Sequence, residues 1–578
     1  MQFERIKYRD GRVSLADPFY YLKNFETVVA SLGARYAELL SPEEHRFIAR
    51  FGALPQAPRA LLVRMVMRQG VLFRSSRLNY PEIGETLAAV APLIEAGWIE
   101  ATPALDLSQL QQLFTTAELL GFFPSSRPFR KLKKTDLVAV LRTQYTESKP
   151  LHAWCGDASE RVYRLAIGSL CERFRLMFFG NSRQDWREFV LSDLGIFSYE
   201  SIPTGLQSRP FSTRAHIDAF GQLHRCREWL EAGLDLDSIL NAIPPPITDS
   251  AWLEERRQKL LFQIARAYER QGNGRSALEV YSICAHRGAR VRIIRLRECA
   301  QEWQEARRLC LSVQRNPATE MERGQACRML ARLNRKLGIC GSSRRELPRV
   351  PEFDMVLDSP HGDYSVEYCV RDYLARQLQE NTSVHYVENG LVNSLFGLLC
   401  WNAIFAPSPG AFFHDFQYGP ADLTSGYFYE RRHREFAECL GKLRSDDYKA
   451  AIRHSFAAKA GIQSPFVAWG LLSKPLLELA LRCFPAAHLR LWFEWIARDV
   501  QANRAGFPDL VQFWPTERRY RLIEVKGPGD RLQDNQRRLL EFCAAHQMPV
   551  AVCYVSWAQS AEKKDLTAAK QNGATSVA

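Results

Sequence analysis

The chain has 578 residues, 46% of them hydrophobic and 24% charged, so it is long enough for three or four domains with sizeable cores. Its net charge of +13 and its pI near 9.1 favour a polyanionic partner, although a generally basic surface gives the same balance. The 14 cysteines form no CxxC pair, which argues against a structural zinc site and fits reduced thiols.

We expect no membrane segment and no signal peptide. The first residues lack an apolar run. The longest uncharged stretch, residues 389–413, contains two prolines and three glycines, and its helical part is too short to span a bilayer.

Helical patterns fill the first hundred residues. Ser41 and Pro42 suit the N-cap and the first position of a helix, and residues 61–66 carry an apolar helical face. Short strand-like segments near Phe73 and Trp98 alternate with these helices. We therefore expect residues 1–100 to be a winged-helix-like DNA-binding region, with a helical spacer bearing solvated arginines as the alternative.

Residues 101–165 combine two helical segments with a basic loop between them, an arrangement that resembles a SAP module, a small DNA-binding helical hairpin. A helix N-terminus beside lysines is suited to bind phosphate. We predict DNA contacts in this loop, and a solvated basic loop is the alternative. The predicted contacts are Arg127, Arg130, Lys131, Lys133 and Lys134.

Residues 166–345 are expected to be helical, and much of this region resembles degenerate tetratricopeptide hairpins. The small, aromatic and turn residues that carry the pattern are Ala265, Tyr268, Gly272, Ala277 and Tyr281. Such arrays usually bind peptides or serve as scaffolds. A cluster of arginines nevertheless leaves contact with the DNA backbone open, through Arg290, Arg292 and Arg295.

Residues 366–558 are predicted to form an α/β domain whose chemistry lies at a hairpin. Asp509 opens one strand-like run, and Glu524 and Lys526 lie two residues apart on the returning strand, on the same side. Two carboxylates and a lysine can bind Mg²⁺ and handle a proton, which is the chemistry of phosphodiester hydrolysis. The alternative is a surface hairpin with a fortuitous ion pair.

Pro508-Asp509 followed by Glu524-Val525-Lys526 resembles the PD-(D/E)xK nuclease motif. The longer run 524–536 resembles the VRR-NUC class, in particular the Fanconi-associated nuclease. The resemblance implies Mg²⁺ or Mn²⁺ as cofactor. It implies the catalytic residues Asp509, Glu524, Lys526 and Gln536. It also implies the metal ligands Glu388, Asp509, Glu524 and Val525.

The fold implied is multidomain and mainly α, with a helical N-terminal DNA-binding region, tetratricopeptide-like repeats and a C-terminal α/β PD-(D/E)xK core. Residues 341–365 are expected to be a linker and residues 559–578 a flexible tail.

The function implied is that of a metal-dependent, structure-selective DNA nuclease. Such family members cut 5′ flaps, trim DNA 5′ to 3′ and act in interstrand crosslink repair, so branched or flapped DNA is the expected partner. Vertebrate members carry a zinc finger for ubiquitin that is not expected here. A prokaryotic-type member is therefore expected, in the cytoplasm with the nucleoid; a eukaryotic one would be nuclear. A four-way-junction nuclease and a non-catalytic DNA-binding scaffold are the alternatives.

Overall fold

The structure is a computed structural model, and it describes residues 17–68, 70–123, 130–155, 160–181, 184, 197–202, 209–339, 349–359, 364–377 and 382–558. Two compact units make up the chain: Met1–Phe197 with Phe211–Ile217, and Ser198–Pro210 with Asp218–Ala578.

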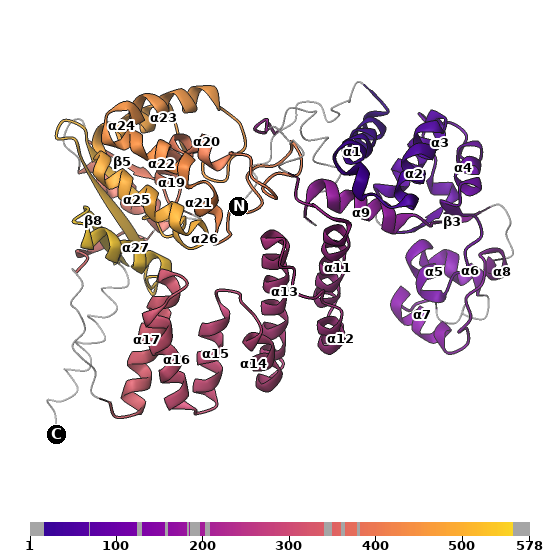
Figure 1. Ribbon diagram of the computed structural model, residues 1–578, viewed down its shortest axis with the longest axis horizontal. Coiled ribbons are helices and arrows are strands. Elements are labelled where there is room, and N and C mark those ends of the chain that lie inside the picture. The colour runs from indigo at the N-terminus through magenta and orange to yellow at the C-terminus, as the bar shows by residue number, and fades with distance from the viewer. Residues whose placement is uncertain are drawn as a thin grey trace. The chain divides into compact units, whose positions relative to one another are not determined.

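The first unit begins with helices packed around a small sheet (Figure 1). Strand β3 pairs antiparallel with both β1 and β2, so a strand that follows the SAP-like segment completes the sheet. Ser41 caps α2 and forms a capping box with Glu44, as the sequence predicts. The elements are α1 (Tyr20–Tyr36), α2 (Pro42–Ala53), α3 (Gln56–Val66), β1 (Leu72–Arg74), α4 (Thr86–Glu95), β2 (Ile99–Glu100), β3 (Val162–Leu165) and α9 (Gly168–Phe179).

The SAP-like part has its own core, with Leu110, Leu119 and Leu137 fully buried. The first predicted helix is in fact two helices, because Phe114 is extended and Thr115 starts a second capping box with Glu118. The elements are α5 (Leu107–Leu113), α6 (Thr116–Phe122), α7 (Lys134–Arg142) and α8 (His152–Cys155).

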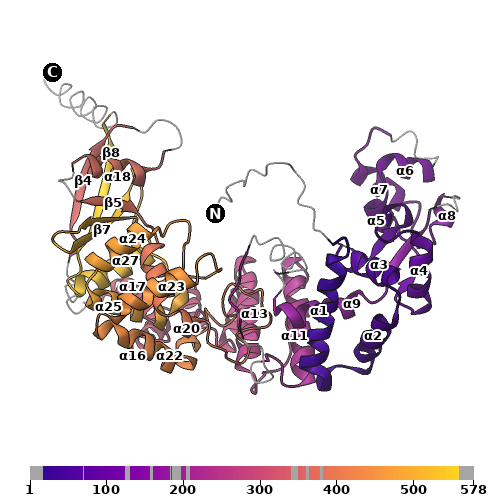
Figure 2. The same ribbon diagram turned by 90° about the horizontal axis from the view of Figure 1, so that it is seen from above.

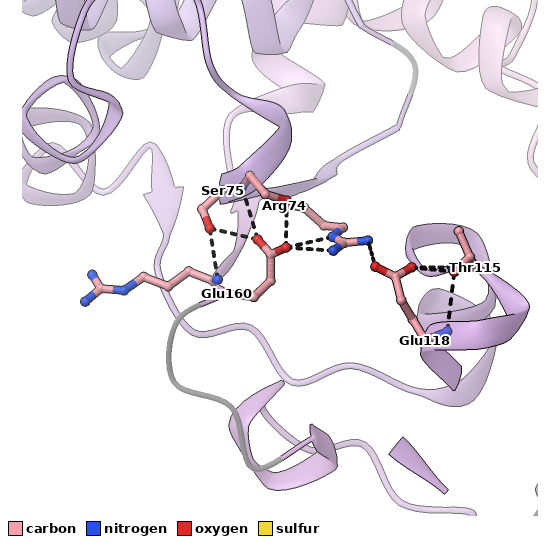
Figure 3. A network of polar contacts seen from close by, with 7 residues as sticks. Arg74, Ser75, Thr115, Glu118 and Glu160 are labelled. Carbon is pink, nitrogen blue, oxygen red and sulfur yellow. Dashed lines mark hydrogen bonds and ion pairs between the residues drawn. The ribbon is translucent and has the colours of Figure 1, made fainter. Parts of the chain in front are cut away.

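Arg74, at the end of β1, joins the small sheet to the SAP-like part (Figure 3). Its guanidinium lies 2.7 Å from Glu160 and 2.7 Å from Glu118 of α6, over the ring of Phe114. Partial burial opposes ionisation of Glu160, but hydrogen bonds from Ser76 and the contact with Arg74 outweigh it and lower the pKa of Glu160 to about 2. The Arg74 and Glu160 side chains are only 12% and 14% exposed, so this ion pair is largely shielded from solvent, whereas Glu118 is half-buried.

The second unit starts with a row of helices that Figure 1 shows standing beside one another. Antiparallel pairs such as α13 with α14 bury the predicted small and aromatic positions, including Ala265, Tyr268 and Ala277. The turn between these two helices holds Gly272 at a φ of +79°. The elements are α11 (Arg214–Glu231), whose first residues, through Ile217, belong to the first unit, α12 (Leu236–Asn241), α13 (Ala251–Arg270), α14 (Gly274–Ser282), α15 (Ala289–Cys299), α16 (Trp303–Arg315) and α17 (Glu320–Lys336).

The rest of the second unit is built on a five-stranded sheet in the order β4-β8-β7-β6-β5. β4, β8 and β7 run parallel, and β6 is antiparallel to both β7 and β5. β4 lies within the stretch expected to be a linker, and its pairing with β8 makes it part of the sheet. The strands are β4 (Glu352–Leu357), β5 (Ser383–Tyr386), β6 (Leu510–Trp514), β7 (Arg519–Lys526) and β8 (Val550–Trp557).

Helices cover this sheet (Figure 2). Val370 of α18 packs into the core that contains Leu510 and Ile523, whereas α19, α25 and α27 contribute to a larger core with Val511 and Leu522. The helices are α18 (Val366–Arg376), α19 (Leu391–Leu399), α20 (Trp401–Ile404), α21 (Phe428–Arg431), α22 (His433–Gly441), α23 (Asp447–Ala458), α24 (Lys474–Cys483), α25 (Ala486–Arg498), α26 (Val500–Asn503) and α27 (Asp534–Ala545).

The uncharged stretch 389–413 contributes α19 and α20 to the larger core. Across the described residues, every helix falls short of the length and apolarity needed to cross a bilayer.

The Arg74 network yields a stability prediction. Arg74→Gln should lower the free energy of unfolding of the first unit by about 1–3 kcal/mol, because two half-buried carboxylates lose a shared cation. Hydrogen exchange of the α5–α7 amides should speed up. Arg164→Gln is the control, since its ion pair with Glu100 is exposed and worth at most about 1 kcal/mol. Equal effects of the two substitutions would contradict this role for Arg74.

Candidate active site

The hairpin of β6 and β7 brings the predicted acidic residues and the lysine together. Leu510 lies opposite Ile523, and this register places the Asp509 carboxylate on the backbone N–H of Val525 at 2.8 Å. The Lys526 ammonium lies 2.8 Å from Glu524, as expected for i and i+2 on one strand. The arrangement predicted from the sequence for these three side chains is therefore present in the fold.

A second loop is fastened to the Asp509 loop. Asn389 has a left-handed φ of +49°, and its side-chain oxygen accepts hydrogen bonds from the N–H groups of Gly506 at 2.7 Å and Phe507 at 2.9 Å. The Val387 N–H donates to the Asp509 carbonyl at 2.7 Å. These three contacts hold Glu388, between Val387 and Asn389, beside the hairpin.

Gly506 lets α27 approach this site closely. Its φ is +102°, and a Cβ there would lie 2.8 Å from the backbone of Asn535 and 3.0 Å from the Gln536 nitrogen. Only glycine fits without moving the helix. Gln536 is thereby placed next to the Asp509 loop, where its side chain accepts the Gln533 N–H at 2.9 Å and caps α27.

The site concentrates negative charge in a buried position. Glu524 is 0% exposed, and Asp509 and Lys526 are also buried. Burial raises the pKa of Asp509, and the charges of Glu367 and Glu388 raise it further against the Val525 hydrogen bond. Burial and then the charge of Asp509 raise the pKa of Glu524, although Lys526 opposes this. Without a cation, these carboxylates resist being ionised together.

Glu367 is a nearby carboxylate that sequence analysis missed. It lies in the first turn of α18, and its charge acts on Asp509. In the sequence, Glu367 is recognisable only as an acidic residue at the start of a helix. Acidic residues are common there because they interact favourably with the helix dipole, so this position does not indicate a functional role. Its approach to Asp509 depends on how α18 packs on the sheet.

The residues fit a hard divalent cation. Among the described residues, no three ligating side chains are gathered closely enough to enclose an ion. Mg²⁺, however, commonly takes one or two protein carboxylates and completes its shell with water and phosphate oxygens. The exposed Glu388, whose carboxylate accepts a hydrogen bond from the Tyr386 hydroxyl at 2.5 Å, lies on the solvent side of the buried pair Asp509 and Glu524.

The predicted DNA contacts near α7 are accessible where they are described. Arg130, Lys131 and Lys133 are exposed, Lys134 is half-buried as the first residue of α7, and Arg127 lies outside the described residues. A helix N-terminus therefore does adjoin basic side chains, the arrangement from which phosphate contacts were predicted.

The predicted contacts on α15 differ from one another. Arg290 is paired with Glu322, and Arg292 with Glu269, so both cations are already partly neutralised. Arg295 is exposed and lines a cavity of about 850 Å³ between the repeats and α26. Of the three, Arg295 is the residue best placed to contact a phosphate.

Three stretches of the chain match models of known domain families. Residues 19–100 match "FAN1, HTH domain", residues 104–154 match "Fanconi anemia-associated nuclease SAP domain", and residues 443–557 match "VRR-NUC domain". The fold and site thus define a nuclease of the VRR-NUC class that carries helix-turn-helix and SAP modules.

Similar proteins cover nearly the whole chain. A Fanconi-associated nuclease 1 homolog of Pseudomonas aeruginosa is 49% identical over 94% of this chain and 97% of its own length. A homolog from Arabidopsis thaliana is 24% identical over 93% of this chain and 67% of its own length. A crystal structure described as paFAN1 bound to 2-nucleotide 5′-flap DNA with a gap superposes with a TM-score of 0.89, over 94% of this chain and 99% of that one. The chain belongs to the Fanconi-associated nuclease family and is of the prokaryotic type.

The charge in the site yields a prediction about the metal-free protein. Asp509→Asn should raise the melting temperature in the presence of a chelator, because asparagine still accepts the Val525 N–H and removes one negative charge beside Glu524. Added Mn²⁺ should then raise the melting temperature of the wild type more than that of the variant. A variant that melts lower than the wild type in chelator would contradict this account.

Proposed function

We propose that this protein hydrolyses phosphodiesters in flapped DNA with the aid of Mg²⁺ or Mn²⁺. The observation that carries the proposal is the hairpin of β6 and β7. In it the Asp509 carboxylate accepts the Val525 N–H, Lys526 forms an ion pair with Glu524, and all three side chains are buried. Burying ionisable groups costs free energy of folding, and a non-catalytic scaffold would gain nothing from it.

Each residue has a distinct proposed role. A bound Mg²⁺ or Mn²⁺ would polarise the scissile phosphate and make a bound water more acidic. Asp509, Glu524, the Val525 carbonyl and Glu388 would supply the protein oxygens for that ion. The Lys526 ammonium would orient the attacking water or stabilise charge on the phosphate. Gln536, at the start of α27 and next to the Asp509 loop, is proposed as a further catalytic residue.

The proposed substrate is a 5′ flap, with 5′-to-3′ trimming as a second activity and interstrand crosslink repair as the cellular role. Two crystal structures described as paFAN1 bound to 5′-flap DNA are 49% identical to this chain over 94% of its length. Such junctions interrupt base stacking and bend at low cost, so a basic body can select them without reading bases. Arg130, Lys131, Lys133, Lys134 and Arg295 are the proposed phosphate contacts.

The catalytic assignment predicts a separation between cleavage and binding. Asp509→Ala or Lys526→Ala should slow cleavage of a labelled flap substrate at least about a hundredfold. Binding to the same DNA should stay within a few-fold, because affinity comes from many distant phosphate contacts. Glu517→Ala is a matched control, since Glu517 is an exposed carboxylate in the turn of the same hairpin. Near-normal cleavage by purified Asp509→Ala protein would rule the assignment out.

Substrate choice is tested by a side-by-side time course on labelled 5′-flap, 3′-flap, four-way-junction and linear duplex DNA at one salt concentration. We expect the 5′-flap duplex to be cut fastest, on the strand that bears the flap. Equal rates on flap and linear DNA would refute structure selectivity. Fastest cutting of the four-way junction would favour the junction-nuclease alternative.

A further inference from the structure

Three tyrosines stand in a row on the surface beside the candidate active site, and we call them the tyrosine ladder: Tyr364, Tyr368 and Tyr386. The ring centres of Tyr364 and Tyr368 are 5.7 Å apart, and those of Tyr368 and Tyr386 are 5.1 Å apart. Both pairs are tilted, by 36° and 44°, so the rings follow one another like offset steps.

The inner end of the ladder reaches the catalytic carboxylates. Tyr386 is the last residue of β5 and lies opposite Leu510, the residue after Asp509. Its hydroxyl donates to Glu388 at 2.5 Å. Tyr368 is adjacent in sequence to Glu367, whose charge acts on Asp509. Figure 2 shows α18, which carries Tyr368, beside the strands that hold the site.

The outer end of the ladder is open. Tyr364 is 45% exposed, and its hydroxyl donates to Asp372. Arg371 lies over the ring of Tyr368 at 4.5 Å and forms an ion pair with Asp372. The hydroxyl contact holds Tyr364 at its edge and Arg371 covers a face of Tyr368, so the ladder is preorganised although part of Tyr364 faces water.

A row of tyrosines with one exposed ring, beside a nuclease site, is suited to stack on an unpaired base. Every base has a π-face, so stacking on tyrosine holds single-stranded DNA without regard to sequence. Packing of α18 on the sheet explains the buried Val370, but it does not explain a tyrosine that is 45% exposed at the end of the row. A nuclease that cuts at a flap has unpaired bases next to the bond it breaks.

We propose that the tyrosine ladder stacks an unpaired base of the DNA strand next to the scissile phosphate and thereby guides that strand to Asp509 and Glu524. The proposal rests on the proposed function as a flap nuclease. Tyr364 provides the accessible face, and Tyr368 and Tyr386 support it and connect it to the site.

The test uses the full-length protein and flap DNA with 2-aminopurine at the nucleotides that flank the cut, with Ca²⁺ in place of Mg²⁺ to slow cleavage. The wild type should quench the fluorescence of one of these positions. Tyr364→Leu should abolish this quenching and weaken binding about tenfold, the loss of one base stacking on an aromatic ring. Tyr364→Phe should retain both, because the ring remains and only the hydroxyl is lost.

Tyr373→Leu is the matched control. Tyr373 is an exposed tyrosine of α18, at 37%, and it lies about 140° around the helix from Tyr368. This variant should behave as the wild type. The proposal fails if Tyr364→Leu quenches and binds as the wild type does, or if Tyr364→Phe loses as much as Tyr364→Leu. A wild type that cleaves none of the DNAs with Mg²⁺ or Mn²⁺ would overturn the proposed function instead.

Discussion

The hydrogen bond from the Val525 N–H to the Asp509 carboxylate is the contact on which the candidate site depends. It requires the register of β6 on β7, which sets Leu510 opposite Ile523 in the middle of the sheet. Glu524 and Lys526 follow from that register by the alternation of a strand. The contacts of Asn389 and the glycine at 506 then bring Glu388 and α27 to the same place.

The same arrangement is electrostatically unfavourable in the absence of a cation. Glu524 is fully buried, and the charges of Asp509 and Glu388 add to the cost of ionising it, while Lys526 compensates only in part. A packed sheet with Leu510 and Ile523 completely buried can hold such a site in one geometry. This conflict between local charge and global packing is typical of functional sites, and a divalent ion would relieve it.

The parts that could be predicted from the sequence were local ones. Ser41 can be recognised as a cap from the three residues that follow it. The hairpin that joins Asp509 to Glu524 and Lys526 needs only one turn between two neighbouring strands. The pairing of β4 with β8 joins residues two hundred positions apart, such as Glu352 and Val552, so the sequence around β4 shows no partner and predicts a linker instead of a strand. Glu367 was missed for the same reason, because only the packing of α18 brings it to the site.

The most direct test of the central claim is the anomalous scattering of Mn²⁺ in crystals of this protein with uncleaved flap DNA. Our account predicts a peak within coordination distance of the Asp509 and Glu524 carboxylates, and none there in Asp509→Ala crystals grown in the same way. Bound DNA with no peak at these two carboxylates would contradict the claim that they hold the metal for hydrolysis.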